Sequence, residues 1–274
     1  MASFTNFATL SYNGGTTNSN IVTGEILEAL TAVKTAVSAN YSAGDRITYA
    51  LSLVNTGTAA VTDYTVTDNL GGYTVGANTV YPLAYNAGTV RYYINGVLQT
   101  APTVTAGPPL TVTGLTIPAG GSAVLIYETT ATPVAPLATG SSITNTATIT
   151  GGGLTNPITA QATVETATSA DLTISKALSP TTVTENGQIT YTFVISNTGN
   201  TEATATGNVV VTDTFAPILR NIAVTYNGTA WTEGTNYTYN AATGVFTTLA
   251  GQITVPAATF TQNTDGTFTV TPGT

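Results

Sequence analysis

The chain contains no cysteine and no histidine, and only 5 of its 274 residues are lysine or arginine. Without cysteine and histidine it can form no disulfide, no thiolate or imidazole metal site, and no catalytic site that needs a thiol nucleophile or an imidazole base. The net charge of −8 disfavours nucleic acid or an anionic membrane as a partner. We therefore expect neither a cofactor nor a nucleic-acid partner.

Long apolar runs are also missing, because no stretch approaches the roughly 20 residues needed to span a bilayer. The start of the chain, Met1-Ala2-Ser3-Phe4, lacks the basic and apolar regions of a signal peptide, which leaves the export route open. The 13 carboxylates are scattered, without a pair suited to glycoside hydrolysis or a calcium-loop pattern. We expect no membrane insertion, no metal site and no enzyme acting on a substrate.

What the chain does contain favours β-structure. Charged residues make up only 7% of it, against roughly 25% in a typical soluble domain. Threonine, valine, isoleucine and tyrosine favour strands, while glycine and asparagine favour turns. Hydrophobic residues make up 42%, and the length is sufficient for two domains that each have a core. The composition therefore predicts an all-β protein of two domains.

An internal repeat supports this division, since residues 30–57 align with residues 172–199 without a gap. Each copy places a lysine, a tyrosine, an asparagine and a glycine at the same positions: Lys34 with Lys176, Tyr49 with Tyr191, Asn55 with Asn197, and Gly57 with Gly199. Apolar residues alternate with small polar ones over residues 47–53 and 189–195, which is the period of a half-buried strand. We expect two immunoglobulin-like β-sandwich modules, at 29–168 and 169–274. Only residues 25–36 have a helical composition, and we expect a linker with a short helical turn there.

A second repeat concerns the N-terminus. Residues 4–11 (FTNFATLS) match residues 143–150 (ITNTATIT), and residues 16–26 resemble residues 154–164. Residues 1–28 thus look like the closing hairpin of a module whose body is absent. The second module has no counterpart of residues 141–164. It also lacks a clear equivalent of the strand at 122–128, for which 267–270 is a possible substitute.

A sandwich that lacks its closing strands exposes strand edges and an open core. A matching hairpin from a neighbouring chain would repair both defects, as in donor-strand complementation. The N-terminal hairpin belongs, by its register, to a module that precedes the first one. We therefore expect a heterologous contact, which propagates into a head-to-tail homopolymer unless a ring closes. The alternative is that the N-terminal segment is a disordered or capping strand.

The repeat places the two lysines of the chain at the same position in the first strand of each module, and each copy carries an equivalent acid, Asp68 or Asp213. The closing hairpin of the first module brings Asn145, and its match in the N-terminal hairpin is Asn6. Lysine, aspartate and asparagine that converge between two sheets can form an isopeptide bond. Burial favours the neutral amine as nucleophile and the protonated acid as proton carrier. The hypothesis joins Lys34 to Asn145 within a module and Lys176 to Asn6 between subunits, with Asp68 and Asp213 assisting. The alternative places the lysines on exposed edge strands and the other residues in turns.

These motifs resemble the conserved-repeat module called domain of unknown function eleven, found in surface proteins of Gram-positive bacteria. The resemblance rests on four segments: Leu172–Lys176, Ile189–Tyr191 with Asn197–Gly199, Val211–Asp213, and Ile143–Thr148. It implies an immunoglobulin-like fold in surface stalks and adhesins. Related surface modules carry Lys–Asn isopeptide bonds assisted by an acid, an arrangement that the lysine, aspartate and asparagine positions match. The missing signal peptide, the missing sortase-type anchoring motif and the incomplete last module fit a self-assembling appendage better than a wall-anchored protein.

We therefore expect a structural subunit of an extracellular bacterial filament on the cell or spore surface. Release by lysis of the producing cell would need no signal peptide. The alternative is a monomeric surface adhesin or carbohydrate-binding module. Sugar binding would use exposed aromatic side chains, for which Trp231, Tyr237 and Tyr239 are the candidates.

Overall fold

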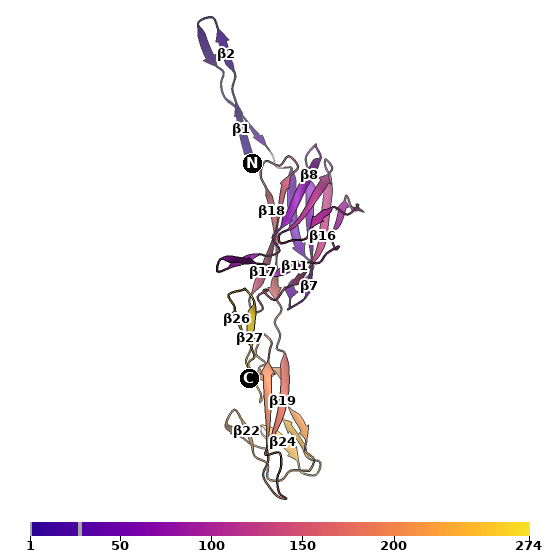
Figure 1. Cartoon of the computed structure of the whole chain (residues 1–274), viewed down its shortest axis with the longest axis vertical. Helices are drawn as coiled ribbons and strands as arrows, with labels where there is room; N and C mark the ends of the chain where they lie inside the picture. The colour runs from indigo at the N-terminus through magenta and orange to yellow at the C-terminus, as the bar shows by residue number, and fades with distance from the viewer. Residues whose placement is uncertain (1, 27–28) are drawn as a thin grey trace. The chain divides into compact units, whose positions relative to one another are not determined.

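The structure is a computed structural model that describes residues 2–26 and 29–274. Strands make up nearly all of its regular structure (Figure 1), and the one helical element in the described residues is a 3₁₀ turn at Ala205–Gly207. The chain divides into two compact units. The first comprises 1–136, 140–166 and 264–267; the second comprises 137–139, 167–263 and 268–274. The predicted all-β class is confirmed.

The first unit contains two six-stranded sheets. One sheet has the order β13-β12-β16-β7-β5, with β11 also on β16: Val97–Leu98, Arg91–Ile94, Ser122–Ala131, Arg46–Asn55, Leu30–Ala36 and Leu83–Tyr85. The other has the order β14-β15-β8-β17-β18-β6: Thr103–Thr105, Leu110–Ile117, Val61–Asp68, Ser142–Gly151, Ile158–Thr166 and Asn40–Tyr41. A small hairpin pairs β9 (Tyr73–Val75) with β10 (Asn78–Val80).

The core of the first unit lies between these two sheets. Alternate residues of β7, which are Ile47, Tyr49, Leu51 and Leu53, are buried, because successive side chains of a strand point to opposite faces. The same alternation buries every second residue of β17 in the other sheet, from Ile143 to Ile149. Side chains of the first sheet are hydrogen-bonded to the second, as where Tyr92 donates to a carbonyl oxygen of β15. The unit is therefore a β-sandwich.

The N-terminal residues form two consecutive antiparallel pairs. Strand β1 (Ala2–Asn6) pairs with β4 (Val22–Ile26), and β2 (Thr9–Tyr12) pairs with β3 (Gly15–Asn18). We call residues 2–26 the N-terminal hairpin. Its large apolar side chains are exposed: Phe4, Phe7, Leu10, Tyr12, Ile21 and Val22.

The expected helical turn in residues 25–36 is not found. Residues 25–26 end β4 and residues 30–36 are strand β5, while residues 27 and 28 lie outside the described residues. Strand β5 pairs with β7 along its whole length, and its inward side chains Leu30 and Lys34 are buried. This pairing overrides a helical composition, since propensity is a weak local preference.

The second unit is built from shorter strands. The pairs are β19 (Leu172–Ser179) with β20 (Thr190–Asn197), β22 (Val224–Tyr226) with β23 (Thr229–Trp231), and β26 (Thr259–Gln262) with β27 (Phe268–Thr271). A three-stranded sheet has the order β21-β25-β24: Thr212–Thr214, Val245–Thr248 and Tyr237–Asn240. The core consists of two clusters, one around Val211 and Val255 and one around Phe215 and Phe246, and Trp231 packs against both.

Residues 267–270 do not replace the strand at 122–128 in the second unit. Strand β27 pairs with β26 in a hairpin of its own. Strand β20 pairs with β19, and in the described part of the chain its other edge meets only an isolated bridge between Asn197 and Gly273. The suggested substitution was therefore wrong, because β27 forms no ladder with β20 in the described residues.

Each unit has a buried asparagine at the same position of the repeat, and the two asparagines have the same role. The Asn55 side-chain amide donates to the carbonyl oxygens of Ala59 (2.8 Å) and Pro118 (3.0 Å). Asn197 donates in the same way to Thr201 (2.7 Å) and Pro256 (3.0 Å). Each side-chain oxygen accepts a hydrogen bond from the backbone N–H of the glycine two residues later. The repeat seen in the sequence is thus a repeated turn that one asparagine holds in each unit.

Replacing Asn197 by alanine should lower the free energy of unfolding of the second unit by about 2 to 3 kcal/mol, because it leaves buried backbone groups without partners. Trp231 is the single tryptophan of the chain and packs in this unit, so its fluorescence in a urea titration reports the change. Gln188→Ala, at an exposed position, should shift the free energy by less than about 0.5 kcal/mol. Equal effects of the two variants would contradict the assigned role.

Candidate functional site

The Lys34 side chain lies in the interior of the first unit. Lys34 stands on β5 opposite Leu51 of β7, and its side chain is 0% exposed. Its Nζ atom lies 2.5 Å from Oδ2 of Asp68. Asp68 is the last residue of β8 in the other sheet, and it is buried as well. The ion pair therefore joins the two sheets across the core.

Both carboxylate oxygens of Asp68 are in use. Oδ2 accepts a second hydrogen bond, from the phenol of Tyr127 on β16, and Oδ1 accepts one from the backbone N–H of Leu70 at 3.0 Å. A buried charge is tolerated only when it is paired and hydrogen-bonded. Asp68 meets this condition through lysine, tyrosine and backbone donors.

Asn145 completes the cluster from β17. Asp68 is paired with Ala147 on that strand, and Asn145 lies two residues earlier, so both side chains point to the same face. Asn145 Nδ2 donates to the Tyr127 hydroxyl at 3.5 Å. Its Oδ1 atom is buried and has no hydrogen-bond partner among the described residues. The structure thus brings Lys34, Asp68 and Asn145 together, with Tyr127 between the acid and the amide.

Aromatic rings surround the lysine. Its Nζ lies 4.8 Å from the ring centroid of Tyr49 and 5.8 Å from that of Tyr127, and these two rings stack on each other. Burial lowers the pKa of Lys34 to about 8, although the neighbouring Asp68 acts in the opposite direction. Burial also raises the pKa of the Tyr127 phenol well above its usual value. A fraction of the Lys34 amine is therefore neutral near pH 7, whereas Tyr127 keeps its hydrogen.

The second unit repeats the ion pair in an open setting. Lys176 Nζ lies 2.5 Å from Asp213 Oδ2, but the Lys176 side chain is 40% exposed. The rings of Tyr191, Phe215 and Phe193 lie 4.6, 5.3 and 5.5 Å from the amine. Within residues 2–26 and 29–274, no side-chain amide is hydrogen-bonded to this pair. The site therefore has its lysine, acid and rings but not its asparagine.

Asn6, the predicted partner of Lys176 from a neighbouring chain, is exposed at the end of β1, opposite Val22 of β4. The aromatic rings around both lysines were not predicted from the sequence. The match of Tyr49 with Tyr191 was visible in the repeat and could have indicated them. Tyr127 had no such signal, because its strand has no counterpart in the alignment of the two copies.

The aromatic residues considered for sugar binding pack in or against the core of the second unit, with Trp231 and Tyr239 half-buried. Tyr237 is buried, Trp231 stacks on Tyr226 at 4.9 Å, and the Tyr239 hydroxyl donates to the Leu219 carbonyl oxygen at 2.9 Å. A sugar platform needs rings that are free to solvent on one face. The carbohydrate-binding alternative therefore gains no support from this cluster.

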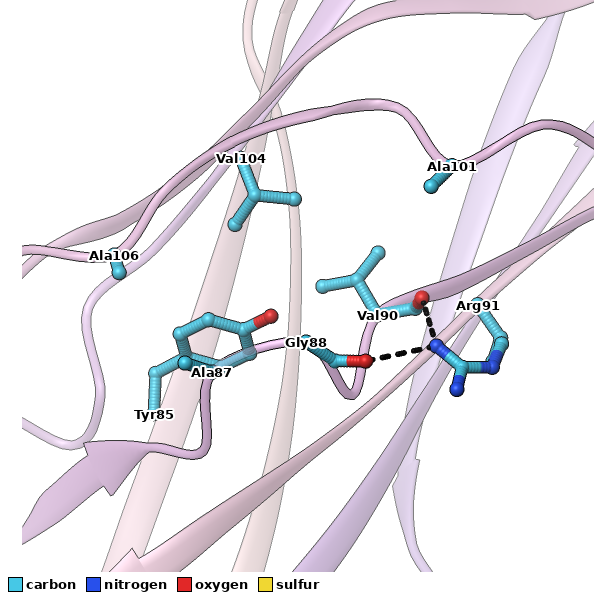
Figure 2. Close-up of a pocket in the computed structure, with 8 residues that line it drawn as sticks. All are labelled: Tyr85, Ala87, Gly88, Val90, Arg91, Ala101, Val104 and Ala106. Atoms are coloured by element: carbon cyan, nitrogen blue, oxygen red, sulfur yellow. Dashed lines mark hydrogen bonds between the residues drawn. The ribbon is translucent and has the colours of Figure 1, made fainter.

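A shallow hollow of about 220 Å³ lies on the first unit near β11, β12 and β14 (Figure 2). Alanine and valine side chains form most of its lining, with Tyr85 at one side. The guanidinium group of Arg91 is hydrogen-bonded to the carbonyl oxygens of Gly88 and Val90, at 2.9 Å each. One guanidinium nitrogen is therefore engaged with the backbone, and the lining is mostly apolar.

In the described ranges, no helix is long and apolar enough to cross a membrane, and no three acidic side chains cluster as a metal site would require.

No family model matches the chain, and no curated protein matches it in sequence. Among solved structures, the chain is similar to BcpA, the major pilin subunit of Bacillus cereus, with 15% identity, a TM-score of 0.38, and coverage of 97% of this chain and 72% of that one. It is similar to the pilus backbone RrgB of Streptococcus pneumoniae, with 15% identity, a TM-score of 0.35, and coverage of 44% of this chain and 31% of that one. A collagen-binding domain of a Staphylococcus aureus adhesin has 14% identity and a TM-score of 0.33, with coverage of 52% and 99%. With TM-scores below 0.5, these similarities carry no conclusion about what the chain does.

The lowered pKa of Lys34 predicts a pH dependence of stability while its amine is free. The unfolded chain, with a lysine pKa of 10.5, binds more protons than the folded one between about pH 8 and 10.5. The free energy of unfolding of an Asn145→Ala variant should therefore rise with pH over this window. Calorimetry of the first unit's transition measures it, and adding Lys34→Met should abolish the rise. A rise of the same size in the double variant would contradict the assignment to Lys34.

Proposed function

We propose that the chain is the structural subunit of an extracellular bacterial filament. Subunits join head to tail when the N-terminal hairpin of one copy completes the second unit of the next. One observation carries the proposal: both units hold the same lysine–aspartate pair among aromatic side chains, but within the described residues an asparagine adjoins only the first pair. The N-terminal hairpin carries the matching residue, Asn6, in a segment whose sequence resembles β17.

The N-terminal hairpin has the apolar surface that a donor needs. Phe4, Leu10 and Val22 are 54%, 63% and 55% exposed. Covering each of them would contribute about 1 to 2 kcal/mol, since full burial of such a side chain contributes about 1.5 to 3. A neighbour's second unit, with its exposed strand β19, would gain the closing strands that the first unit already has in β17 and β18.

The first unit also supplies the register of the proposed contact. There, Ala147 is paired with Asp68 and Thr148 with Thr67. The equivalent register places Ala8 opposite Asp213 and Thr9 opposite Thr212 of the neighbouring copy. Asn6 would then take the position of Asn145, facing Lys176.

Docking would prepare the chemistry at Lys176. A neighbour that covers this half-exposed amine disfavours its charged form, and Asp213 takes up the proton. The neutral amine attacks the Asn6 side-chain carbonyl carbon and a new C–N bond forms. Asp213 gives its proton to the amide nitrogen, which leaves as ammonia, and then takes the extra proton of the new amide nitrogen. Fixed proximity of well-oriented groups can correspond to about 10⁵ M or more of free reactant. The same reaction between Lys34 and Asn145 would join the two sheets of the first unit.

The resulting contact is heterologous, so each added subunit presents a new open site and growth continues. The subunit then has a structural role, and the cross-link forms between residues of its own copies and not on a separate substrate. Membership of the conserved-repeat surface family and display on a cell or spore surface are part of this proposal.

Concentrated native protein should give a ladder of multimers on a denaturing gel after boiling in detergent. Peptides that contain Lys176 and Asn6 should be joined with the loss of one ammonia in mass spectrometry. Asn6→Ala should remove the ladder, because it removes the electrophile. Asn145→Ala should keep the ladder and lose only the internal bond. A single band with unmodified lysines in the native protein would overturn the cross-link.

Paired cysteines test the register. The native chain has no cysteine, so a disulfide can form only between introduced residues. In an Asn6→Ala background, Thr9→Cys with Thr212→Cys should give a ladder under mild oxidation that reductant removes, because paired strands bring the Cα atoms within disulfide range. Leu10→Cys with Thr212→Cys, one residue out of register and on the opposite face, should give little. Equal ladders from both pairs would rule out this register.

A further inference from the structure

We propose that Tyr127 is a catalytic residue of the internal cross-link, carrying a proton between Asp68 and the departing amide nitrogen of Asn145. This inference rests on the proposed Lys34–Asn145 bond and assigns a role that the lysine, acid and amide by themselves leave open. The attacking nitrogen must lose protons on one side of the reacting carbon, and the leaving nitrogen must gain one on the other. Something must connect the two sides inside a closed core.

The hydrogen bonds supply that connection. Tyr127 donates to the same Asp68 oxygen that lies 2.5 Å from the Lys34 amine. The same hydroxyl accepts from Asn145 Nδ2 at 3.5 Å. The sequence of contacts therefore runs from the nucleophile through the acid and the phenol to the leaving group. Asp68 itself has no direct hydrogen bond to Asn145 among the described contacts, since its other oxygen is held by the Leu70 N–H.

The proton steps balance along this route. Lys34 gives a proton to Asp68, and its neutral amine attacks the side-chain carbonyl carbon of Asn145. The phenol passes its hydrogen to Nδ2 while it takes the proton from Asp68, and the C–Nδ2 bond breaks to release ammonia. The new amide nitrogen returns its extra proton to Asp68. The products are the amide, ammonia and a neutral carboxyl group, and no oxidant, reductant or water is consumed.

The surroundings suit a relay that is never ionised. Tyr127 is buried and stacks on Tyr49, so its ring is held in one orientation against the cluster. Burial and the neighbouring Asp68 keep the phenol protonated. A group that passes one proton on while it receives another must be in this protonated state. The hydroxyl needs only to rotate from Asp68 toward Nδ2 once the acid holds the proton.

The second unit provides a contrast. In the described residues no phenol is hydrogen-bonded to Asp213, whose Oδ2 is bonded to Lys176. Tyr191 matches Tyr49, but no strand of this unit matches β16, which carries Tyr127.

The test uses the Asn6→Ala chain, in which only the internal bond can form, and adds Tyr127→Phe. Intact mass and the joined Lys34–Asn145 peptide are followed from purification onward. We expect the parent to be fully joined at the first time point and the Tyr127→Phe protein to be largely unjoined. Its bond should then form about 10²- to 10⁴-fold more slowly, the usual contribution of a positioned proton carrier. Tyr64→Phe is the matched control. Tyr64 is buried like Tyr127, but its hydroxyl, unlike that of Tyr127, has no hydrogen-bond partner in the described structure. That control should be fully joined.

The outcomes separate two failures. A parent that never loses ammonia overturns the proposed cross-link itself. A joined parent with an equally joined Tyr127→Phe protein overturns only the role of Tyr127. If Tyr127→Phe lacks the near-ultraviolet circular dichroism of the folded parent, 3,5-difluorotyrosine is placed at position 127 instead. This residue keeps the ring and the hydroxyl but makes the phenol more acidic. Its bond formation should then slow at alkaline pH, where the fluorinated phenol ionises. An unchanged pH profile would overturn the inference.

Discussion

The ion pair between Lys34 and Asp68 is the interaction on which the first unit depends, because it places two charges inside the core of a sandwich. Charges removed from water are costly unless they are paired and every remaining hydrogen-bonding position is filled. The surrounding residues meet this demand: Tyr127 and the Leu70 backbone satisfy the acid, and the Tyr49 and Tyr127 rings face the ammonium group. The strands that bring these residues together come from both sheets, so their arrangement follows from keeping this pair buried.

The second unit has the same pair with a different degree of cover. The distance between amine and carboxylate is again 2.5 Å, and aromatic rings again surround the lysine, yet its side chain is 40% exposed. The two sites therefore differ more in the solvent exposure of the lysine than in the geometry of the ion pair. In the first unit β17 and β18 provide the cover and the asparagine together. This coupling is why a hairpin donated by a neighbour, as proposed, would supply both the strand pairing and the reactive amide in one event.

The repeated asparagine turn shows what the two units have in common apart from the lysine site. Asn55 donates to three backbone carbonyl oxygens and Asn197 to two, and each accepts from a glycine N–H; they hold the end of the strand that pairs with the lysine strand. The same turn thus ends β7 and β20, the two strands whose tyrosines Tyr49 and Tyr191 lie near Lys34 and Lys176.

Sequence alone determined the all-β class, the repeat, and the lysine, aspartate and asparagine positions that the first unit brings together, because alternation and repeat equivalence are written in the order of residues. The repeat placed Lys34 on a strand, whereas the composition of residues 25–36 suggested a helical turn, and the pairing with β7 decides for the strand. The sequence could not tell that β27 pairs with β26, or that Tyr127 lies between Asp68 and Asn145. These features depend on contacts between residues far apart in the chain, and only the tertiary structure decides which distant groups share one buried volume.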